Sequence, residues 1–247
     1  CCMILFFSAT GNSEYAAKRI AAATGDAALS IADCGGTVRI AAGEKLGVVC
    51  PTYFGGLPTV VREFISAADF DVPQGAYVFF VATYGTCSGG AAHFAKKLLA
   101  DKGVALSAAF DVRMPDTWTP LFDLSDAARL ARIRAKEDGQ IDAICKRIQN
   151  GEKGNFAAGR VPAFAARAFQ LVYELARRTS HFWVESSCIG CGLCAKNCPV
   201  KAIALENGRP VWQRDKCAMC LGCLHRCPKF AIQYGRRTKR HGQYLHP

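Results

Sequence analysis

The sequence predicts an α/β protein in which a doubly wound, five-stranded parallel sheet is followed by a small α+β domain. Short apolar runs alternate with amphipathic segments over the first 150 residues, a pattern typical of parallel strands covered by helices. Eight of the 14 cysteines lie within residues 188–227, in two runs of identical spacing. Residues 1–150 carry 15 Lys or Arg against 15 Asp or Glu, whereas residues 151–247 carry 16 against 5. The whole net charge of +11 therefore belongs to the second part, which indicates two units.

The first unit is expected to form from five apolar strands with helices between them. The expected strands lie at about 3–7, 28–32, 45–50, 76–83 and 105–112. The expected helices lie at about 13–23, 58–68, 90–101 and 124–149. In the last of these, Leu130, Ile133 and Ile141 recur at helical spacing, and Ser125 is a possible cap.

Residues 151–182 are expected to join the first domain, residues 1–150, to a second domain at residues 183–247. The segment 150–160 is rich in Gly and polar residues, which indicates a linker. Pro162 then stands where a helix would begin. In the second domain, Asn207-Gly208 between two alternating apolar stretches predicts a hairpin.

The helix after Pro162 has an apolar stripe that allows two interpretations. The stripe consists of Phe164, Ala168, Leu171 and Leu175, with arginines interspersed. A helix lying on a membrane surface is one interpretation, and a helix connecting the two domains is the other. The segment is short and only moderately basic, which favours the connecting helix.

Composition excludes several classes of protein. With 51% hydrophobic and 21% charged residues, the chain is neither disordered nor collagen-like. No apolar run approaches the roughly 18 to 20 residues of a transmembrane segment, and there is no secretory signal. We therefore expect a soluble, cytoplasmic protein without disulfides. The first residue is Cys1, so we expect the initiator methionine to be absent from this sequence.

The two cysteine runs predict two iron–sulfur clusters. They read Cys188-x2-Cys191-x2-Cys194-x3-Cys198-Pro199 and Cys217-x2-Cys220-x2-Cys223-x3-Cys227-Pro228. This is the known ligand pattern of bacterial proteins with two clusters, in which the fourth Cys of each run binds the other cluster. One 4Fe–4S cluster is thus assigned to Cys188, Cys191, Cys194 and Cys227, and the second to Cys217, Cys220, Cys223 and Cys198.

Two structural zinc sites are the alternative for the cysteine runs. Zinc sites are typically built from two separated Cys pairs, whereas a third Cys after two more residues serves a cubane better. With all eight ligands thiolate, no iron position is open to substrate, so the clusters are expected to transfer electrons.

The other six cysteines lie among apolar and small residues, as buried structural cysteines do: Cys1, Cys2, Cys34, Cys50, Cys87 and Cys145. A redox-active thiol at Cys87 is the alternative, but it has no His or resolving Cys nearby in sequence. His225 lies inside the second run and is expected at the surface or as a hydrogen-bond donor near a cluster.

The loop after the first strand predicts an anion site. Strand 3–7 runs into Ser8-Ala9-Thr10-Gly11-Asn12-Ser13 and then a helix. Free N–H groups and the positive end of the helix dipole meet three hydroxyl groups there. The three glycines of a dinucleotide fingerprint and the Gly-Lys-Ser/Thr of a nucleotide-triphosphate loop are both absent from this segment. A capped turn without a ligand is the alternative.

Two further strand ends offer residues that suit a planar ligand. Ligands of doubly wound sheets lie outside the carboxyl ends of the strands. There the chain has Pro51-Thr52-Tyr53-Phe54-Gly55-Gly56 and Thr83-Tyr84-Gly85-Thr86-Cys87-Ser88-Gly89, in which aromatic residues stand beside glycines. Core packing is the weaker explanation for aromatic residues in Gly-rich loops beyond the strand ends. The candidate residues are Thr52, Tyr53, Phe54, Gly55, Gly56, Thr83, Tyr84, Gly85, Cys87 and Gly89.

Taken together, these motifs resemble those of the flavodoxin–ferredoxin fusion proteins of anaerobic bacteria. Residues 1–150 resemble a flavodoxin-like domain, whose phosphate loop has the form Ser/Thr-x-Thr-Gly-Asn-Ser/Thr, and residues 183–235 resemble a bacterial two-cluster ferredoxin. The resemblance implies FMN, with its phosphate held by Ser8, Thr10, Gly11, Asn12 and Ser13. It also implies that Tyr53 or Phe54 and Tyr84 flank the isoalloxazine. The ring-flanking loops lack the acidic, Trp-containing surroundings of many free flavodoxins.

The resemblance implies an electron-transfer protein that passes electrons between two clusters and FMN and converts one-electron to two-electron transfer. The alternative is an FMN-dependent reductase of a small organic substrate, with residues 111–122 covering the ring. Whether the chain is an enzyme is left open. Two clusters would reduce the charge to roughly +7, which is still basic. Nucleic-acid binding is disfavoured because the Lys and Arg residues are spread among the cluster loops and no binding motif is present. We expect an acidic redox partner such as a ferredoxin, a flavodoxin or a reductase.

Overall fold

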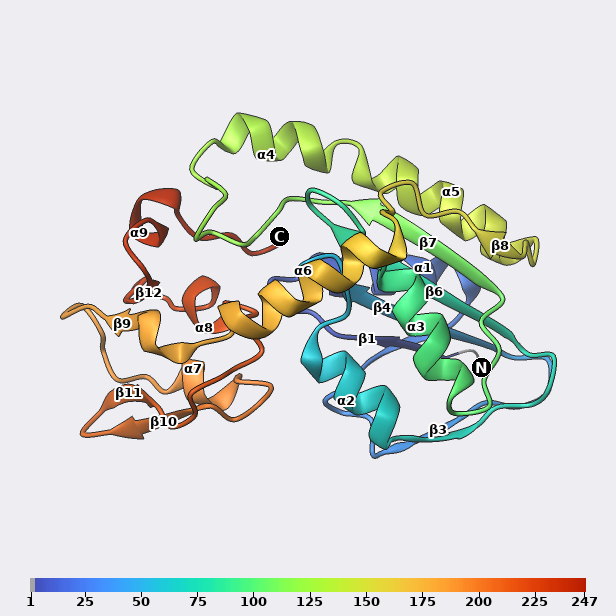
Figure 1. The fold of residues 1–247 in the computed structure, drawn as a ribbon. Coiled ribbons are helices and arrows are strands. Elements are labelled where there is room, and N and C mark those ends of the chain that lie inside the picture. Colours follow the sequence, from blue (N-terminus) through green and yellow to red (C-terminus); the bar gives the residue numbers. More distant parts are fainter. Residues whose placement is uncertain (1–2) are drawn as a thin grey trace.

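The computed structural model describes residues 3–247, so Cys1 and Cys2 lie outside the described residues. Its central sheet is parallel throughout and has the strand order β2-β1-β4-β6-β7-β8 (Figure 1). The strands are β1 (Met3–Phe6), β2 (Ala27–Ser30), β4 (Lys45–Pro51), β6 (Tyr77–Tyr84), β7 (Ala108–Arg113) and β8 (Gly154–Asn155). Because the strand order reverses between β1 and β4, their carboxyl ends form the edge where ligands of doubly wound sheets bind.

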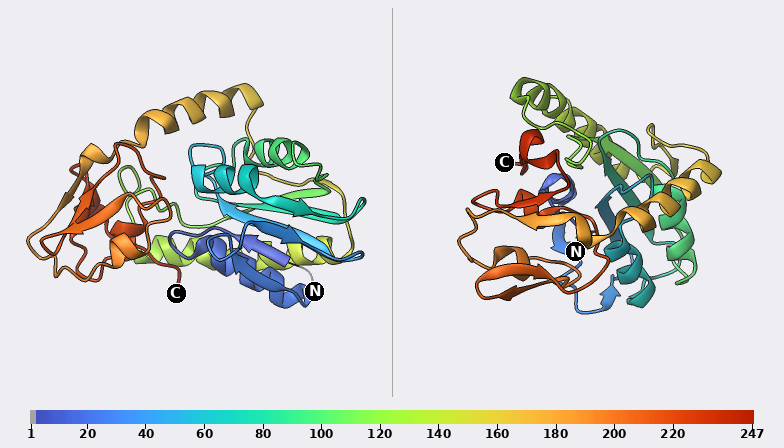
Figure 2. Two further views of the ribbon diagram at one scale, coloured as in Figure 1. Left: turned by 90° about the horizontal axis from the view of Figure 1, so that it is seen from below. Right: turned by 60° about the vertical axis from the view of Figure 1, so that its left-hand side comes forward.

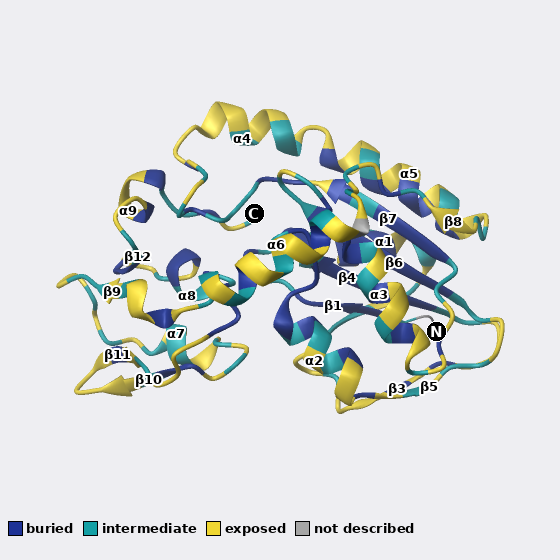
Figure 3. Cartoon of the chain, viewed as in Figure 1, coloured by how far each residue is buried: buried dark blue, intermediate teal, exposed yellow. Residues whose placement is uncertain are grey.

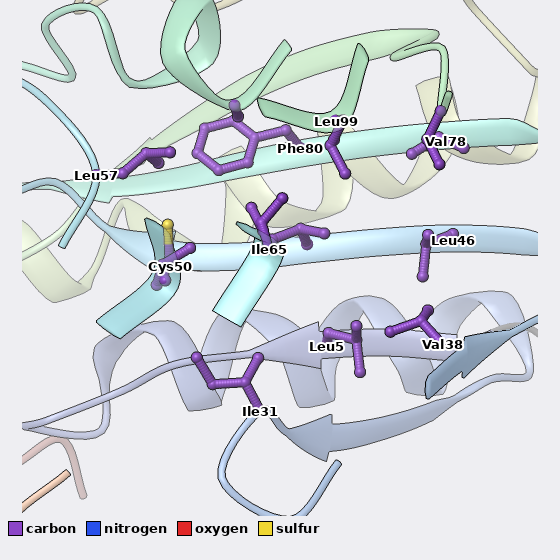
Figure 4. Close-up of a cluster of buried hydrophobic side chains, with 14 of the residues drawn as sticks. Leu5, Ile31, Val38, Leu46, Cys50, Leu57, Ile65, Val78, Phe80 and Leu99 are labelled. Carbon is purple, nitrogen blue, oxygen red and sulfur yellow. The ribbon is translucent and has the colours of Figure 1, made fainter. Parts of the chain in front are cut away.

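Helices cover both faces of this sheet. α2 (Thr59–Ala67) and α3 (Ala91–Ala100) pack on one face, and α1 (Asn12–Thr24) and α5 (Glu137–Gln149) on the other (Figure 2). Side chains alternate along each strand, so Leu5 faces α2 and α3 while Ile4 faces α1 and α5. The side chains of the first face form a continuous buried cluster (Figure 4). This confirms the predicted doubly wound α/β fold.

Three elements differ from the expectation. The segment 124–149 forms two helices, α4 (Ala127–Arg134) and α5, which are separated at Ala135 and Lys136. Asp126, not Ser125, caps α4 by accepting the N–H of Arg129. Within the segment expected to be a linker, β8 adds a sixth strand to the sheet through Gly154 and Asn155. A further two-stranded sheet joins β3 (Thr37–Arg39) to β5 (Asp69–Asp71).

The second part is built from short elements. These are the 3-10 turn Thr179–His181, β9 (Phe182–Val184), α7 (Leu193–Lys196), β10 (Ile203–Glu206), β11 (Arg209–Trp212), α8 (Gly222–His225), β12 (Ile232–Tyr234) and α9 (Thr238–His241). β9 pairs with β12, and β10 pairs with β11, both antiparallel. Asn207 and Gly208 have positive φ, as the predicted hairpin requires.

α6 (Ala163–Ala176) runs between the two parts (Figure 1). Its inner face packs on both of them: Gln170 donates to the carbonyls of Tyr53 and Phe54, and the hydroxyl of Tyr173 donates to the carbonyl of Ala218. Its outer face leaves Phe164 and Leu171 exposed (Figure 3). The helix therefore contacts both parts, as the connecting-helix interpretation expects. No helix in the described part of the chain combines the length and apolar character needed to cross a membrane.

The chain returns to the first part after α9. The carbonyl of His241 accepts the N–H of Leu124, and its Nδ1 lies 2.6 Å from the carbonyl oxygen of Thr119. Further on, the N–H of His246 donates to the carbonyl of Thr10. The second part is thus held to the first by α6 on one side and by residues 241–246 on the other.

Candidate functional site

The predicted phosphate loop lies between β1 and α1. Gly11 is the N-cap of α1 with φ of 96°, and within the described chain no side chain caps this helix end. The N–H groups of a first helical turn have no acceptor inside the helix and carry the positive end of the dipole. The side-chain oxygen of Ser8 accepts the N–H of Gly11 at 3.1 Å, which leaves its own proton available. The loop therefore presents donors suited to an anion.

A cavity of about 350 Å³ opens beside this loop at the carboxyl ends of β1, β4, β6 and β7. Most of the predicted ligand residues line it: Ser8, Thr10, Asn12, Ser13, Thr52, Tyr53, Phe54, Gly55, Thr83, Tyr84, Gly85 and Cys87. Residues 115–118, Leu121, Phe122, Phe169 and residues 219–221 complete the wall. Three strand-end loops that are distant in sequence thus meet at one site.

Gly11, Gly56 and Gly89 are not among the residues that line the cavity, and they shape its loops through the backbone. An added Cβ on Gly11 would lie 2.8 Å from the Cβ of His246, and one on Gly56 would lie 2.5 Å from the amide of Gln170. A Cβ on Gly89 would collide with the backbone of Gly55. Each glycine therefore permits a close approach of two segments.

Aromatic side chains form one wall of the cavity. The Phe54 ring stacks on Tyr173 at 5.5 Å and meets Trp118 edge-to-face at 5.0 Å. Burial raises the pKa of Tyr53 well above its usual value, so its phenol stays protonated. Trp118 belongs to residues 111–122, which were expected to cover the ring in the reductase alternative, but it was not among the predicted ring-flanking residues. The signal for it was a Trp shortly after the end of a strand.

Unpaired polar atoms support the fit of a flavin to this cavity. Asn12 Oδ1 and Trp118 Nε1 are buried and have no hydrogen-bond partner among residues 3–247. The amide of Asn12 is fixed by donation to the carbonyl of Pro115, so its oxygen suits a hydroxyl donor such as that of a ribityl chain. Ser13 and Thr83 share a hydrogen bond of 2.7 Å between their hydroxyls. A free acceptor, a free N–H and donors for an anion are thus combined with aromatic surface.

Burial raises the pKa values of two other residues at the cavity, Cys87 and Asp116. Burial raises the pKa of the Cys87 thiol, which keeps it protonated and disfavours the redox-active interpretation. Burial also raises the pKa of Asp116, although the Trp118 N–H and the Thr86 hydroxyl donate to its carboxylate. Asp116 was not among the residues expected from the sequence.

The first predicted set of cluster ligands surrounds a small cavity. Cys188, Cys191 and Cys194 of the first run and Cys227 of the second line a cavity of about 20 Å³. This is the crossed arrangement expected from the ligand pattern. No group of three or more His, Cys, Asp or Glu side chains in the described chain converges on the position of a single metal ion. Four thiols that line one cavity without converging on a single point suit a cubane better than zinc.

The second set lies deeper. Burial raises the pKa of Cys220 to about 12, and the neighbouring Cys217 and Cys198 thiols contribute to this rise. Burial also raises the pKa of Cys223 well above its usual value, and the same two neighbours are among the causes. Cys198 and Cys223 pack against the same buried hydrophobic cluster as Cys217, so the fourth Cys of the first run lies with the second set.

The two runs repeat their backbone as well as their cysteines. Gly190 and Met219, Gly192 and Leu221, and Lys201 and Phe230 occupy equivalent positions 29 residues apart, and all six have positive φ. The N–H of Ala202 lies 3.2 Å from Cys198 Sγ, and the N–H of Ala231 lies 3.3 Å from Cys227 Sγ. Such N–H donors stabilise thiolate ligands and tune cluster potentials.

The second cysteine run meets the flavin cavity. Met219, Cys220 and Leu221 line that cavity together with the phosphate loop. Arg226 Nε donates to the carbonyl of Ala9 at 2.8 Å, which ties α8 to the same loop. The cavity beside the predicted phosphate loop is therefore walled in part by a predicted cluster ligand, Cys220.

His225 strengthens this contact between the two parts. Its Nδ1 accepts the N–H of Tyr244, so Nε2 carries the proton and donates to the carbonyl of Thr117 at 2.8 Å. Burial lowers the pKa of His225 to about 4, so the ring is neutral. It is a buried hydrogen-bond donor near a cluster, one of the two expected roles.

Comparison with known proteins identifies the two parts. The family described as "Flavodoxin domain" matches residues 3–144, which is more than half of the chain. The chain belongs to the flavodoxin domain family. The family described as "4Fe-4S dicluster domain" matches residues 187–232. The flavodoxin domain is thus followed by a ferredoxin domain, as in flavodoxin–ferredoxin fusions, and the pair supports an iron–sulfur flavoprotein in electron transfer.

Three curated relatives each match a short stretch of the chain. "Ferredoxin-type protein FwdE" of Methanocaldococcus jannaschii is 38% identical over 53 residues, which are 22% of this chain and 34% of that protein. "Coenzyme F420 hydrogenase subunit gamma" of Methanosarcina barkeri is 55% identical over 31 residues, 13% of this chain and 12% of the other. A component of the ion-translocating oxidoreductase complex of Methanosarcina acetivorans is 39% identical over 49 residues, 20% of this chain and 19% of the other. The chain spans about a third or less of these relatives.

Among solved structures, rubredoxin oxygen:oxidoreductase from the anaerobe Desulfovibrio gigas matches with a TM-score of 0.34 and 16% identity. The match covers 60% of this chain and 36% of that one.

Proposed function

We propose that this chain passes electrons between two 4Fe–4S clusters and an FMN held in the cavity of its flavodoxin domain, and thereby couples one-electron to two-electron transfer. When bound, each cluster would carry one electron and the flavin one or two. The clusters would be held by Cys188, Cys191, Cys194 and Cys227, and by Cys217, Cys220, Cys223 and Cys198. An acidic redox partner and a cytoplasmic location stay predictions from the sequence.

One observation carries this proposal: Cys220 lines the same cavity as Ser8, Asn12 and Tyr84. A ligand of the second cluster and the residues that would bind the flavin thus share a wall. Two unrelated cofactor domains joined by a linker would not require such contact. Fixed proximity of this kind is what electron transfer within one chain needs.

The residues of the chain have separate tasks in this scheme. The first turn of α1 and the hydroxyls of Ser8 and Thr10 would bind the phosphate. Asn12 Oδ1 would accept from the ribityl chain, and the wall of Phe54 and Trp118 would keep water from one side of the ring. Tyr173, whose hydroxyl donates to Ala218 at 2.7 Å while its ring stacks on Phe54, fixes the second cysteine loop against the flavin loop.

The proposal is tested by anaerobic isolation, analysis of iron, sulfide and flavin, and stepwise reduction with dithionite. We expect about eight iron atoms per chain, one FMN, and bleaching of the flavin that follows reduction of the clusters. Reduced clusters beside a flavin that never bleaches would contradict the proposal. Eight iron atoms without flavin would show that the flavodoxin domain serves only for docking.

Two matched substitutions separate the clusters. Cys220→Ser and Cys191→Ser make the same chemical change in the second and the first set, and each should remove about four iron atoms. Only Cys220 lines the flavin cavity, so only Cys220→Ser should also weaken FMN binding. Equal FMN affinity in both variants would argue against the shared wall.

A reductase of a small organic substrate is the second candidate. It is favoured by residues 115–118, Leu121 and Phe122, which add a wall to the cavity beyond the strand ends, as a substrate pocket would need. Steady turnover of a small acceptor without any partner protein would support it. Turnover only in the presence of a protein acceptor would exclude it.

A further inference from the structure

The surface around the first cysteine set differs from the rest of the ferredoxin domain. Ile189, Leu193 and Leu205, which line the cavity of this set, are 60%, 39% and 42% exposed. Cys191 itself is exposed, and Lys229 lies on the same cavity with its side chain toward solvent. We call these five residues the first-cluster face.

The internal repeat shows that this face is specific to one run. The residues equivalent to Ile189 and Leu193 in the second run are Ala218 and Gly222. Ala218 is 1% exposed, and its carbonyl accepts the hydroxyl of Tyr173, while an added Cβ on Gly222 would lie 3.7 Å from Ala9. The second run thus has small residues where the flavodoxin domain covers it. The first run has large apolar residues where nothing in the described chain covers it.

The charge around the face is mainly basic, although the exposed Glu206 follows Leu205 and lies opposite Arg209 in the hairpin. Lys229 has no ion-pair partner in the described chain, and the guanidinium of Arg209, next to the cavity-lining Pro210, bonds only to the carbonyls of Val184 and Glu185. Residues 151–247 as a whole carry 16 Lys or Arg against 5 Asp or Glu. Apolar side chains at the centre of a charged rim are typical of protein interfaces. A second copy would bring a second basic face against this one, which disfavours a symmetric contact.

We propose that the first-cluster face is the docking surface for an acidic electron-carrier protein, which exchanges electrons with the first cluster while the second cluster faces the flavin. The proposal rests on the proposed function for the presence of the clusters. It adds the side of the molecule that the partner uses and the chemistry that the partner must have. Acidic groups of the partner would lie against Lys229, and apolar surface against Ile189 and Leu205.

The test measures binding in the oxidised state, so it does not depend on turnover. The probe is a 2Fe–2S ferredoxin of strongly negative net charge, titrated into the loaded protein by calorimetry at low salt. Lys229→Glu should weaken the complex about sevenfold, as expected for reversing one charge against an acid about 7 Å away in water. Lys96→Glu, at an exposed lysine on α3 without an ion-pair partner among the described residues, changes the net charge equally and should leave affinity within a factor of two.

Two substitutions of exposed leucines test the contribution of the apolar centre of the face. Leu205→Ser should weaken binding about threefold through lost apolar contact. Leu171→Ser, on the exposed face of α6, is the matched control and should have no effect. Equal affinities for Lys229→Glu and Lys96→Glu, or a larger loss from Leu171→Ser than from Leu205→Ser, would overturn the proposal.

The proposed function and the proposed docking surface can be refuted independently of each other. If dithionite reduces the clusters of the unaltered protein without bleaching the flavin, the electron path is wrong, whatever the affinities are. If the flavin bleaches in every variant but the affinities do not separate, only the docking surface is wrong.

Discussion

Alanine at Gly11 should weaken both the fold and the binding of flavin, because this position is crowded as well as left-handed. Gly11 has φ of 96°, and an added Cβ would lie 2.8 Å from the Cβ of His246 and 3.3 Å from its backbone nitrogen. Real Cβ atoms do not approach so closely. The substitution must therefore move residue 246 or the phosphate loop.

The cost of this change follows from two terms. An L-residue in the left-handed region costs about 1–2 kcal/mol. Displacing His246 also breaks its hydrogen bond to Thr10 and its stacking on Tyr15 at 4.2 Å, about 1 kcal/mol each. We therefore expect a loss of about 3 kcal/mol in the free energy of unfolding. A shift of the loop should raise the Kd for FMN about tenfold, which corresponds to about 1.4 kcal/mol.

Gly25→Ala is the matched control. Gly25 ends the same helix with φ of 73°, but its Cβ would meet nothing within 4 Å. Its cost should be the backbone term alone, about 1 kcal/mol, with no effect on FMN affinity.

FMN affinity is measured by the quenching of flavin fluorescence on titration into the apo-protein, and stability by urea unfolding. His246→Gly removes the closest atom, so in a double-mutant cycle it should recover part of the loss caused by Gly11→Ala. If Gly11→Ala and Gly25→Ala behave alike in both assays, crowding at the phosphate loop is not what Gly11 relieves.

Three further predictions concern buried groups. Met219→Gly removes the strain of a left-handed residue, a gain of about 1 kcal/mol, but loses the burial of its side chain, a cost of about 2 kcal/mol. The free energy of unfolding should therefore fall by about 1 kcal/mol, and a gain in stability toward urea would refute this. Burial raises the pKa of Tyr173 to about 12, so its contribution to stability is complete below pH 10 and is lost as the pH rises toward 12. Tyr173→Phe should remove that part of the alkaline decline, measured as the urea midpoint at pH 9 and 11.5, and an unchanged decline would contradict it. Trp118→Phe deletes an N–H that has no acceptor in the described chain, so the stability of the apo-protein should change by less than about 1 kcal/mol. The Kd for FMN should rise about threefold, and an unchanged Kd would show that the flavin accepts no hydrogen bond from this N–H.

The sheet could be predicted from the sequence because its signal is local. Each buried strand is a short apolar run, and alternation along it already separates the two faces, as with Ile4 and Leu5. The strand ends then had to meet, which is why most of the predicted ligand residues line one cavity. The cysteine runs were predictable because their spacing alone specifies the chemistry.

The remaining features depend on contacts between distant segments. β8 is only two residues long and exists because the edge of β7 pairs with it. Asp126 and Ser125 are both good caps, but the Ser125 hydroxyl bonds to Asp123 and Asp126 caps the helix. Trp118 reaches the cavity wall from a distant loop, where its ring meets that of Phe54 edge-to-face. None of these carries a pattern that periodicity can detect.

The two attachments between the domains limit how they can move. A carrier joined by one flexible linker can swing between a donor and an acceptor, so its internal electron transfer slows as the solvent becomes more viscous. Here α6 leaves the flavodoxin domain on one side, and residues 241–246 return to it on the other through Thr119, Leu124 and Thr10. A body held at two separated points keeps its orientation. Internal electron transfer in this chain should therefore be indifferent to added glycerol or sucrose, and only the encounter with an outside partner should slow.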